Sequence, residues 1–185
     1  DYTEESIIEI SGIVDLSEVV IIDLTGDMDP MAVSIGFAPD NILFTADGSK
    51  AVILSRSQVV LVDMVSFDVL VEFPLVLDAD QTVNPSGAVL TSDGTKVLVS
   101  ISGSSDLYVL NLEEGAYSID MADLSGVPSD LAVSSSVGKT LVVYSSLAQV
   151  EFVDNSNGDV DDEIIELDEP ATSVLMGSDF AVLYN

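Results

Sequence analysis

The stretch "FTADGSKAVI" at 44–53 joins a tight-turn signal to an apolar run. It returns as "LTSDGTKVLV" at 90–99 and, in a weaker form, as "SSVGKTLVV" at 135–143. An Asp-Gly pair favours a tight turn because glycine adopts positive φ freely and aspartate tolerates the turn backbone. The turn glycines Gly48, Gly94 and Gly138 are separated by 46 and 44 residues, and a lysine follows each of them. The chain is therefore built on a repeat.

Each repeat contains four short segments with β-strand character. The second and third are apolar on consecutive residues, as in Val52-Ile53-Leu54, which indicates strands covered on both faces. The fourth alternates apolar and polar residues, as at Ile119 and Asp120, which is typical of a half-exposed outer strand. Four short strands per repeat of this length is the pattern of a propeller blade. The sequence therefore predicts an all-β fold, a β-propeller of four-stranded blades.

The repeats divide the chain into blade units. Three complete units are expected, with partial units before and after them, which gives about four blade equivalents. The expected units are 1–37 (partial), 40–76, 85–122, 129–168 and 169–185 (partial). The chain is long enough for one substantial domain of this kind.

The two partial units differ in the strands that they contain. Residues 19–37 fit a third and fourth strand after a candidate second strand at 5–14, whereas 169–185 fit a first and second strand. In a closed ring of about four blades, the smallest size usual for propellers, residues 180–185 would pair with 19–24. We expect instead that the chain self-associates or forms part of a larger propeller, because rings of more blades are more usual for such repeats.

The composition predicts a folded body with an acidic shell. Of the residues, 48% are hydrophobic, while 33 acidic residues oppose only four basic ones and give a net charge of −29. A surface this negative repels nucleic acid and anionic membranes, so we expect neither as a partner. No apolar run reaches the roughly 18 residues that span a bilayer. The charge suits a saline medium, divalent cations or a basic partner.

Several kinds of catalytic chemistry are excluded by residue type. The chain contains no cysteine and no histidine. Disulfides, thiol nucleophiles, histidine bases and zinc sites of the His/Cys type are therefore ruled out. No glycine-rich phosphate-binding loop is present either. We expect no catalytic residues, and no cofactor with the exception of Ca²⁺.

The stretch "DNSNGDVDDE" at 154–163 is the candidate calcium loop, because Ca²⁺ prefers hard oxygen ligands in a flexible turn. The spacing is not that of an EF-hand, since Val153 falls at the first ligand position. The alternative is a solvated hairpin turn. The stretch "DADQT" at 78–82 is a weaker candidate, because Val83 stands where glycine is required. The candidate ligands are Asp154, Asn157, Asp159, Asp161 and Asp162.

Loops at one face of a propeller are the usual place for its ligands. In this chain they are the connections between units and the turns between second and third strands, at 55–58, 76–85, 102–106, 122–129 and 145–148. The alternative for each residue in these loops is an ordinary solvent-facing turn position. The candidate binding residues are Arg56, Asp78, Asp80, Asp106 and Asp123.

The units resemble the YVTN-type β-propeller repeats of bacterial and archaeal surface proteins. The matching pieces are "TADGSKAVIL" with "VVLVDM", "TSDGTKVLVS" with "LYVLNL", and the weaker "SSVGKTLVVY" with "VEFVDN", within 40–168. The chain lacks the Trp-Asp pair of WD40 blades and the Gly-Gly doublet of kelch blades. The resemblance implies an extracellular, cell-surface or periplasmic location. The ionisable residues used by lactonase relatives have no identified counterparts here.

Taken together, these features favour a non-catalytic binding scaffold for a protein or glycan, rather than a protein with a small-molecule substrate. One alternative is a lactonase-like hydrolase whose carboxylates hold a divalent metal. Another is a structural repeat of a surface layer or filament.

The charge of −29 predicts a stability that rises with ionic strength. Salt screens the repulsion among the carboxylates, which the folded state brings closer together. We expect the urea midpoint of unfolding to rise between about 0.1 M and 1 M NaCl, measured by circular dichroism. A midpoint that stays constant or falls would contradict this expectation.

Overall fold

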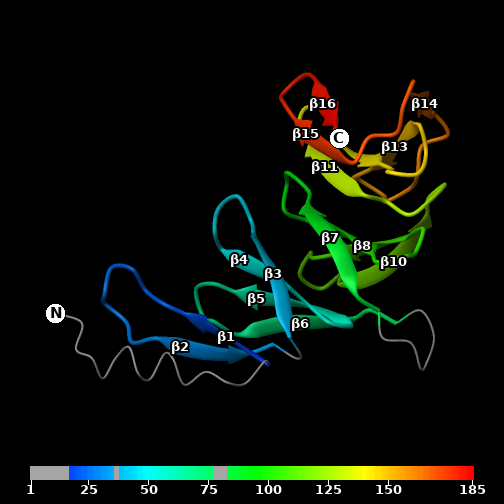
Figure 1. The fold of residues 1–185 in the computed structure, drawn as a ribbon. Coiled ribbons are helices and arrows are strands. Elements are labelled where there is room, and N and C mark those ends of the chain that lie inside the picture. The colour runs from blue at the N-terminus through cyan, green and yellow to red at the C-terminus, as the bar shows by residue number, and fades with distance from the viewer. Residues whose placement is uncertain (1–16, 36–37, 77–82) are drawn as a thin grey trace.

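A computed structural model describes residues 17–35, 38–76 and 83–185. The described residues form sixteen β-strands and no helix, and hence no helix that could cross a membrane (Figure 1). The prediction of an all-β fold is therefore confirmed. The candidate strand at 5–14 and the candidate residues Asp78 and Asp80 lie outside the described residues.

Three four-stranded antiparallel sheets form the middle of the chain, and in each the strands lie in sequence order. The first contains β3 (Pro39–Phe44), β4 (Lys50–Ser55), β5 (Gln58–Asp63) and β6 (Val69–Pro74). The second contains β7 (Pro85–Leu90), β8 (Lys96–Ile101), β9 (Asp106–Asn111) and β10 (Ser118–Asp123). The third contains β11 (Asp130–Ser134), β12 (Lys139–Val143), β13 (Gln149–Asp154) and β14 (Ile165–Glu166). The prediction of four-stranded blades is confirmed.

A two-stranded antiparallel sheet lies at each end of this series. At the N-terminal side β1 (Glu18–Ile21) pairs with β2 (Met31–Ser34), and at the C-terminal side β15 (Ser173–Met176) pairs with β16 (Ala181–Tyr184). Figure 1 shows these two sheets at opposite ends of the row, with the three complete sheets between them. Among the described strands, β1 pairs only with β2 and β16 only with β15, so residues 180–185 do not pair with 19–24.

The first strands of successive sheets contact one another. β3 contacts β7, β7 contacts β11, and β11 contacts β15. Each sheet therefore follows the previous one with its first strand at the shared inner edge (Figure 1). This is how the blades of a propeller are arranged around its axis.

The repeated turns connect the first and second strands, as predicted. Gly48, Gly94 and Gly138 have φ values of 70°, 71° and 65°, a backbone region that residues with a side chain rarely adopt. In the first turn Gly48 N donates to the Thr45 carbonyl at 2.8 Å. The side chain of Asp47 completes this turn, because it accepts hydrogen bonds from Ser49 N at 3.0 Å and from the Thr45 hydroxyl at 2.7 Å.

The second and third strands are buried on both faces. On β4, Val52 and Leu54 pack against the following sheet, whereas Ala51 and Ile53 pack against the preceding one. The side chains of β8 alternate in the same way: Val97 and Val99 pack against the first complete sheet, and Leu98 packs against the third. Consecutive apolar residues are needed because no side of these strands meets water.

The fourth strand of the third sheet is shorter than predicted. The sequence "DEIIELD" at 162–168 was expected to form a full strand, but β14 consists only of Ile165 and Glu166. The preceding turn folds back on β13 instead: Asp161 N donates to the Phe152 carbonyl at 2.8 Å, and Val160 forms a bridge with Val153. The turn therefore takes up part of the ladder that the fourth strand was expected to occupy.

The Asp47 turn predicts a pH-dependent contribution to stability. The hydrogen bonds from Ser49 N and from the Thr45 and Ser49 hydroxyls lower the pKa of Asp47 from 3.8 to about 2. Because the folded-state pKa lies below the ordinary value, the stabilisation is complete above about pH 4 and disappears as the pH falls toward about 2. We expect Asp47→Asn to lower the urea midpoint at about pH 6 and to have little effect at about pH 2.

The matched control for this measurement is Asp120→Asn, since Asp120 is an exposed aspartate on the outer strand β10. The two substitutions change the net charge equally. If both lower the midpoint by the same amount at every pH, the turn hydrogen bonds do not stabilise the fold through the charge of Asp47.

Candidate functional site

One end of the molecule brings together the loops that the sequence singled out. The residue after each fourth strand donates a backbone hydrogen bond to the residue before the third strand of the same sheet. These bonds are Leu75 N to Ser57 O at 2.7 Å, Leu124 N to Ser105 O at 3.1 Å and Leu167 N to Ala148 O at 2.8 Å. The turns between second and third strands therefore lie beside the connections between sheets. We call this end the loop face, and in the described residues it comprises 55–58, 75–76, 83–84, 102–106, 123–129 and 145–149.

Two of the predicted binding residues lie directly opposite each other on the loop face. Asp106 begins β9, Asp123 ends β10, and the two are partners in the strand register. The Ser104 hydroxyl donates to Asp106 Oδ2 at 2.7 Å, and the Ser105 hydroxyl lies 3.5 Å from Asp123 Oδ1. Like charges opposite each other on a sheet destabilise it by a few tenths of a kcal/mol or more. The position therefore presents paired negative charge at a small cost in stability.

Arg56 belongs to the loop face but lies in a different sheet from the aspartate pair. It is exposed in the turn between β4 and β5, beside Ser57, which has a φ of 62°. The Ser57 hydroxyl donates to the Arg56 carbonyl at 2.6 Å. The structure thus brings Asp106 and Asp123 together and gives Arg56 a separate place on the same face.

Tyr108 has a buried hydroxyl near the aspartate pair. Its side chain is only 2% exposed and packs in the core between the first and second complete sheets. The hydroxyl has no hydrogen-bond partner among the described residues. Burial, together with the negative charge of Asp106, raises the pKa of Tyr108 above its usual value. The phenol therefore stays protonated and neutral at all ordinary pH values.

The buried side chain of Glu151 is hydrogen-bonded to a residue of the loop face. Glu151 on β13 is 2% exposed, and its Oε2 accepts hydrogen bonds from the Tyr144 hydroxyl and from Ser125 N at 3.2 Å. Gln149 Nε2 donates to Oε1 at 3.2 Å. Burial and the bond to Glu151 raise the pKa of Tyr144 far above its usual value, so the phenol remains a donor. The group ties the connection at 124–129 to the third sheet.

Glu151 did not emerge from the sequence as a candidate, although a signal was present. The third strands read "QVVLVD", "DLYVLN" and "QVEFVD", and the register of each with its neighbour aligns Val60, Tyr108 and Glu151. An acidic residue in a strand buried on both faces requires hydrogen-bond partners. That requirement, applied at position 151, identifies the residue.

The candidate calcium loop is folded as a turn whose acidic side chains have separate partners. Asp154 Oδ1 accepts hydrogen bonds from Ser156 N at 2.7 Å, and Asp159 Oδ2 accepts one from Asn157 Nδ2 at 2.6 Å. Asp161 forms an ion pair with Lys139. Asp162, like the others, belongs to no group of three or more acidic residues arranged to hold a metal ion, a statement that covers only the residues with a described position. A calcium site at this turn therefore stays a prediction.

Comparison with known proteins gives the fold. No family model matches the chain, and no curated protein matches it. Solved structures do match. The periplasmic gluconolactonase PpgL of Pseudomonas aeruginosa has a TM-score of 0.60 and 19% identity over 83% of this chain and 45% of its own. Both its match and the three complete sheets point to one architecture. The chain has a β-propeller fold.

Two further structures support the same conclusion. A protein of unknown function from Desulfotomaculum acetoxidans DSM 771 has a TM-score of 0.63 and 11% identity, over 89% of this chain and 55% of its own. The dihydro-haem d1 dehydrogenase NirN has a TM-score of 0.65 and 16% identity, over 85% of this chain and 34% of its own. The chain thus spans about half, or less, of these proteins. At such identities the likeness extends to the fold alone.

The Glu151 group predicts a measurable energetic coupling. Glu151→Gln places an amide nitrogen among donors, and we expect it to lower the free energy of unfolding by about 1–3 kcal/mol. In a double-mutant cycle with Tyr144→Phe, measured by urea unfolding, the coupling is expected to be about 0.5–3 kcal/mol. The control is Glu166→Gln on the exposed strand β14, with an effect within about 0.5 kcal/mol. Additive effects of the two core substitutions would show that the hydrogen bond does not contribute.

Proposed function

We propose that this chain is a propeller-type binding scaffold that recognises a basic protein segment or a hydroxyl-rich glycan through its loop face. The observation that carries the proposal is the pair Asp106 and Asp123. Their two carboxylates lie on neighbouring strands at the loop-face end of the second complete sheet. Ser104 and Ser105 orient these carboxylates through their hydroxyls. Ionised carboxylates accept charge-assisted hydrogen bonds from lysine and arginine, and also hydrogen bonds from sugar hydroxyls.

No described aspartate shows the raised pKa that would favour the hydrolase alternative. A catalytic carboxylic acid needs a raised pKa so that it holds a proton near neutral pH. Among the described residues, the aspartates whose pKa departs clearly from the ordinary value lie in or next to turns and are all shifted downward, for the most part by hydrogen bonds within those turns. They are Asp23, Asp47, Asp63, Asp93 and Asp154. Such groups remain negative and act as acceptors.

The cellular location proposed is outside the cytoplasm, at the cell surface, in the periplasm or in the medium. Two observations support it. The repeats resemble the YVTN type found in surface proteins, and one structure with the same fold is described as a periplasmic gluconolactonase. The strong acidity also keeps a protein soluble in a saline medium.

The proposal can be tested with two defined probes, a lysine- and arginine-rich peptide and a neutral oligosaccharide such as cellohexaose. The affinity of each is measured by calorimetry for the unmodified chain and for the double variant Asp106→Asn/Asp123→Asn. We expect at least one probe to bind and the double variant to bind it about tenfold more weakly, which corresponds to the loss of one charge-assisted hydrogen bond.

The matched control is Glu113→Gln/Asp120→Asn, which removes the same charge from exposed positions outside the loop face. Equal weakening in both double variants would indicate general attraction by the acidic shell and would contradict a site at Asp106 and Asp123. Hydrolysis of a lactone that is abolished by a chelator would favour the lactonase-like alternative. Ordered arrays of the chain on cells would favour a structural role in a surface layer or filament.

A further inference from the structure

The turn that follows β13 contains the dipeptide Asn157-Gly158, the one place in the sequence where glycine follows asparagine. Asparagine is a thermolabile residue, because the backbone nitrogen of the next residue can attack the carbon of its side-chain amide. Glycine leaves that nitrogen unhindered, since it has no side chain. The asparagines at 41, 84, 111 and 155 precede residues that do have side chains, namely Ile42, Pro85, Leu112 and Ser156.

The side chain of Asn157 is exposed and is held over the peptide unit of Gly158. Asn157 Oδ1 accepts a hydrogen bond from Asp159 N at 3.0 Å, and Asn157 Nδ2 donates to Asp159 Oδ2 at 2.6 Å. A side-chain oxygen bonded to the amide two residues further on forms an Asx turn, which folds the side chain back over the intervening residue. The bond from Asp159 N also polarises the amide carbonyl for attack. Asn157 Cγ is therefore kept close to Gly158 N.

A hydrogen bond within the turn slows the attack without preventing it. Gly158 N donates to the Asp154 carbonyl at 2.7 Å, and this bond has to open before the nitrogen can react. The loss of one neutral hydrogen bond corresponds to a slowing of about tenfold. Exposure and the absence of a side chain at Gly158 act in the opposite direction.

Asn155 lies in the same turn but in a different environment. It is only 7% exposed, and its Oδ1 accepts a hydrogen bond from the Thr140 hydroxyl at 2.7 Å. The nitrogen that would attack it, Ser156 N, donates to Asp154 Oδ1 at 2.7 Å. Both reacting groups of Asn155 are thus bonded elsewhere, which makes this residue an internal control for Asn157.

The Asp-Gly turns at 47–48 and 93–94 are protected from the same reaction by their charge. Attack on an aspartate requires a protonated carboxyl, because an ionised carboxylate has no leaving group. Hydrogen bonds within its turn lower the pKa of Asp47 to about 2. For Asp93, burial acts to raise the pKa, but hydrogen bonds from Thr91 and Thr95 outweigh it and lower the pKa as well. These two aspartates therefore stay ionised where an asparagine reacts.

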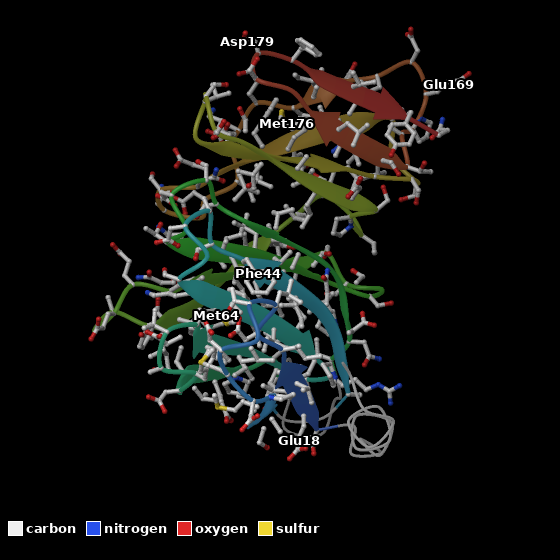
Figure 2. All side chains as sticks on the ribbon, turned by 90° about the vertical axis from the view of Figure 1, so that its left-hand side faces the viewer. Glu18, Phe44, Met64, Glu169, Met176 and Asp179 are labelled. Carbon is white, nitrogen blue, oxygen red and sulfur yellow. The ribbon has the colours of Figure 1, made fainter. Side chains whose placement is uncertain are left out.

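Gly158 is packed against the neighbouring sheet. A Cβ atom at this position would lie 2.9 Å from Val109 Cγ1, closer than side chains approach one another. Val109 belongs to β9 and packs in the core between the second and third complete sheets. Figure 1 and Figure 2 both show these sheets next to each other, the second in green and the third in yellow. The turn therefore forms part of their interface and leaves no room for a longer main chain at 157–158.

We propose that Asn157 is a site of spontaneous modification, and that its product loosens the interface between the second and third complete sheets. Gly158 N loses its proton to the solvent and forms a bond to Asn157 Cγ. The bond from Cγ to Nδ2 breaks, and the nitrogen takes up protons from the solvent and leaves as ammonia. One water molecule then opens the five-membered succinimide at either carbonyl, which gives aspartate or isoaspartate.

Isoaspartate changes the turn more than aspartate does. Both products add one negative charge beside Asp154 and Asp159, but only isoaspartate routes the main chain through the former side chain. This adds one carbon to the backbone directly before Gly158. The contact with Val109 has no space for it, so the turn has to move away from β9.

The modification is tested by incubating the folded chain in mildly alkaline buffer and analysing its peptides by mass spectrometry. We expect Asn157 to be converted at least about tenfold faster than Asn155, with isoaspartate among the products. The same chain incubated in urea is the positive control for detection. Equal rates at Asn157 and Asn155 in the folded chain, or conversion of Asn157 only in urea, would overturn the proposal.

The effect on the interface is tested with two variants. Asn157→Asp carries the added charge on an ordinary backbone, and Asn157→Gln blocks the reaction, because a glutamine would have to form a larger ring. We expect the isoaspartate form to unfold at a lower urea concentration than Asn157→Asp, and incubated Asn157→Gln to keep its original midpoint. Equal midpoints for the isoaspartate form and Asn157→Asp would contradict a loosened interface. A midpoint that falls in incubated Asn157→Gln would place the damage elsewhere in the chain.

Discussion

Ala51 and Ile53 on one face of β4, and Val52 and Leu54 on the other, pack against two different neighbouring sheets. Burial of a side chain the size of Val52, Ile53 or Leu54 contributes about 1.5–3 kcal/mol, so contacts between sheets supply a large part of the apolar stabilisation. Hydrogen bonds hold each sheet together, but a single sheet of this composition cannot bury either face alone. Every sheet therefore needs a neighbour on both sides, and the order of the row, the position of the first strands and the shape of the loop face all follow from that need.

The repeat could be predicted from the sequence because the turn residues and the apolar pattern of the strands indicate it independently. Gly48, Gly94 and Gly138 are at positions with positive φ, and the lysine after each begins a second strand. The consecutive apolar residues of β4 and β8 indicated burial on both faces, which the structure confirms. Local turn chemistry and long-range packing thus agreed, and agreement between these levels is what makes a fold predictable.

The candidate site was readable only in part. Asp106 and Asp123 were placed on the same face by strand order, and the register then brought them opposite each other. Glu151 was missed because its partners are distant from it in the sequence pattern: Tyr144 directly follows β12, and Ser125 lies in the connection between sheets. The shortening of β14 was missed for a similar reason. The length of β14 depends on how the turn at 154–162 folds back on Phe152 and Val153. Strand propensity alone does not predict such a contact.

Hydrogen bonds hold each sheet together and apolar contacts join one sheet to the next. This difference affects how such a chain can change during evolution. The strand ladders run within one sheet, and successive sheets meet through apolar surfaces of the same kind. Duplication or loss of one whole unit of about 45 residues therefore requires no new type of contact, as in other repeat proteins with nearest-neighbour packing. A gene of this kind can alter the circumference of its product one unit at a time, while the loops at the rim diverge independently.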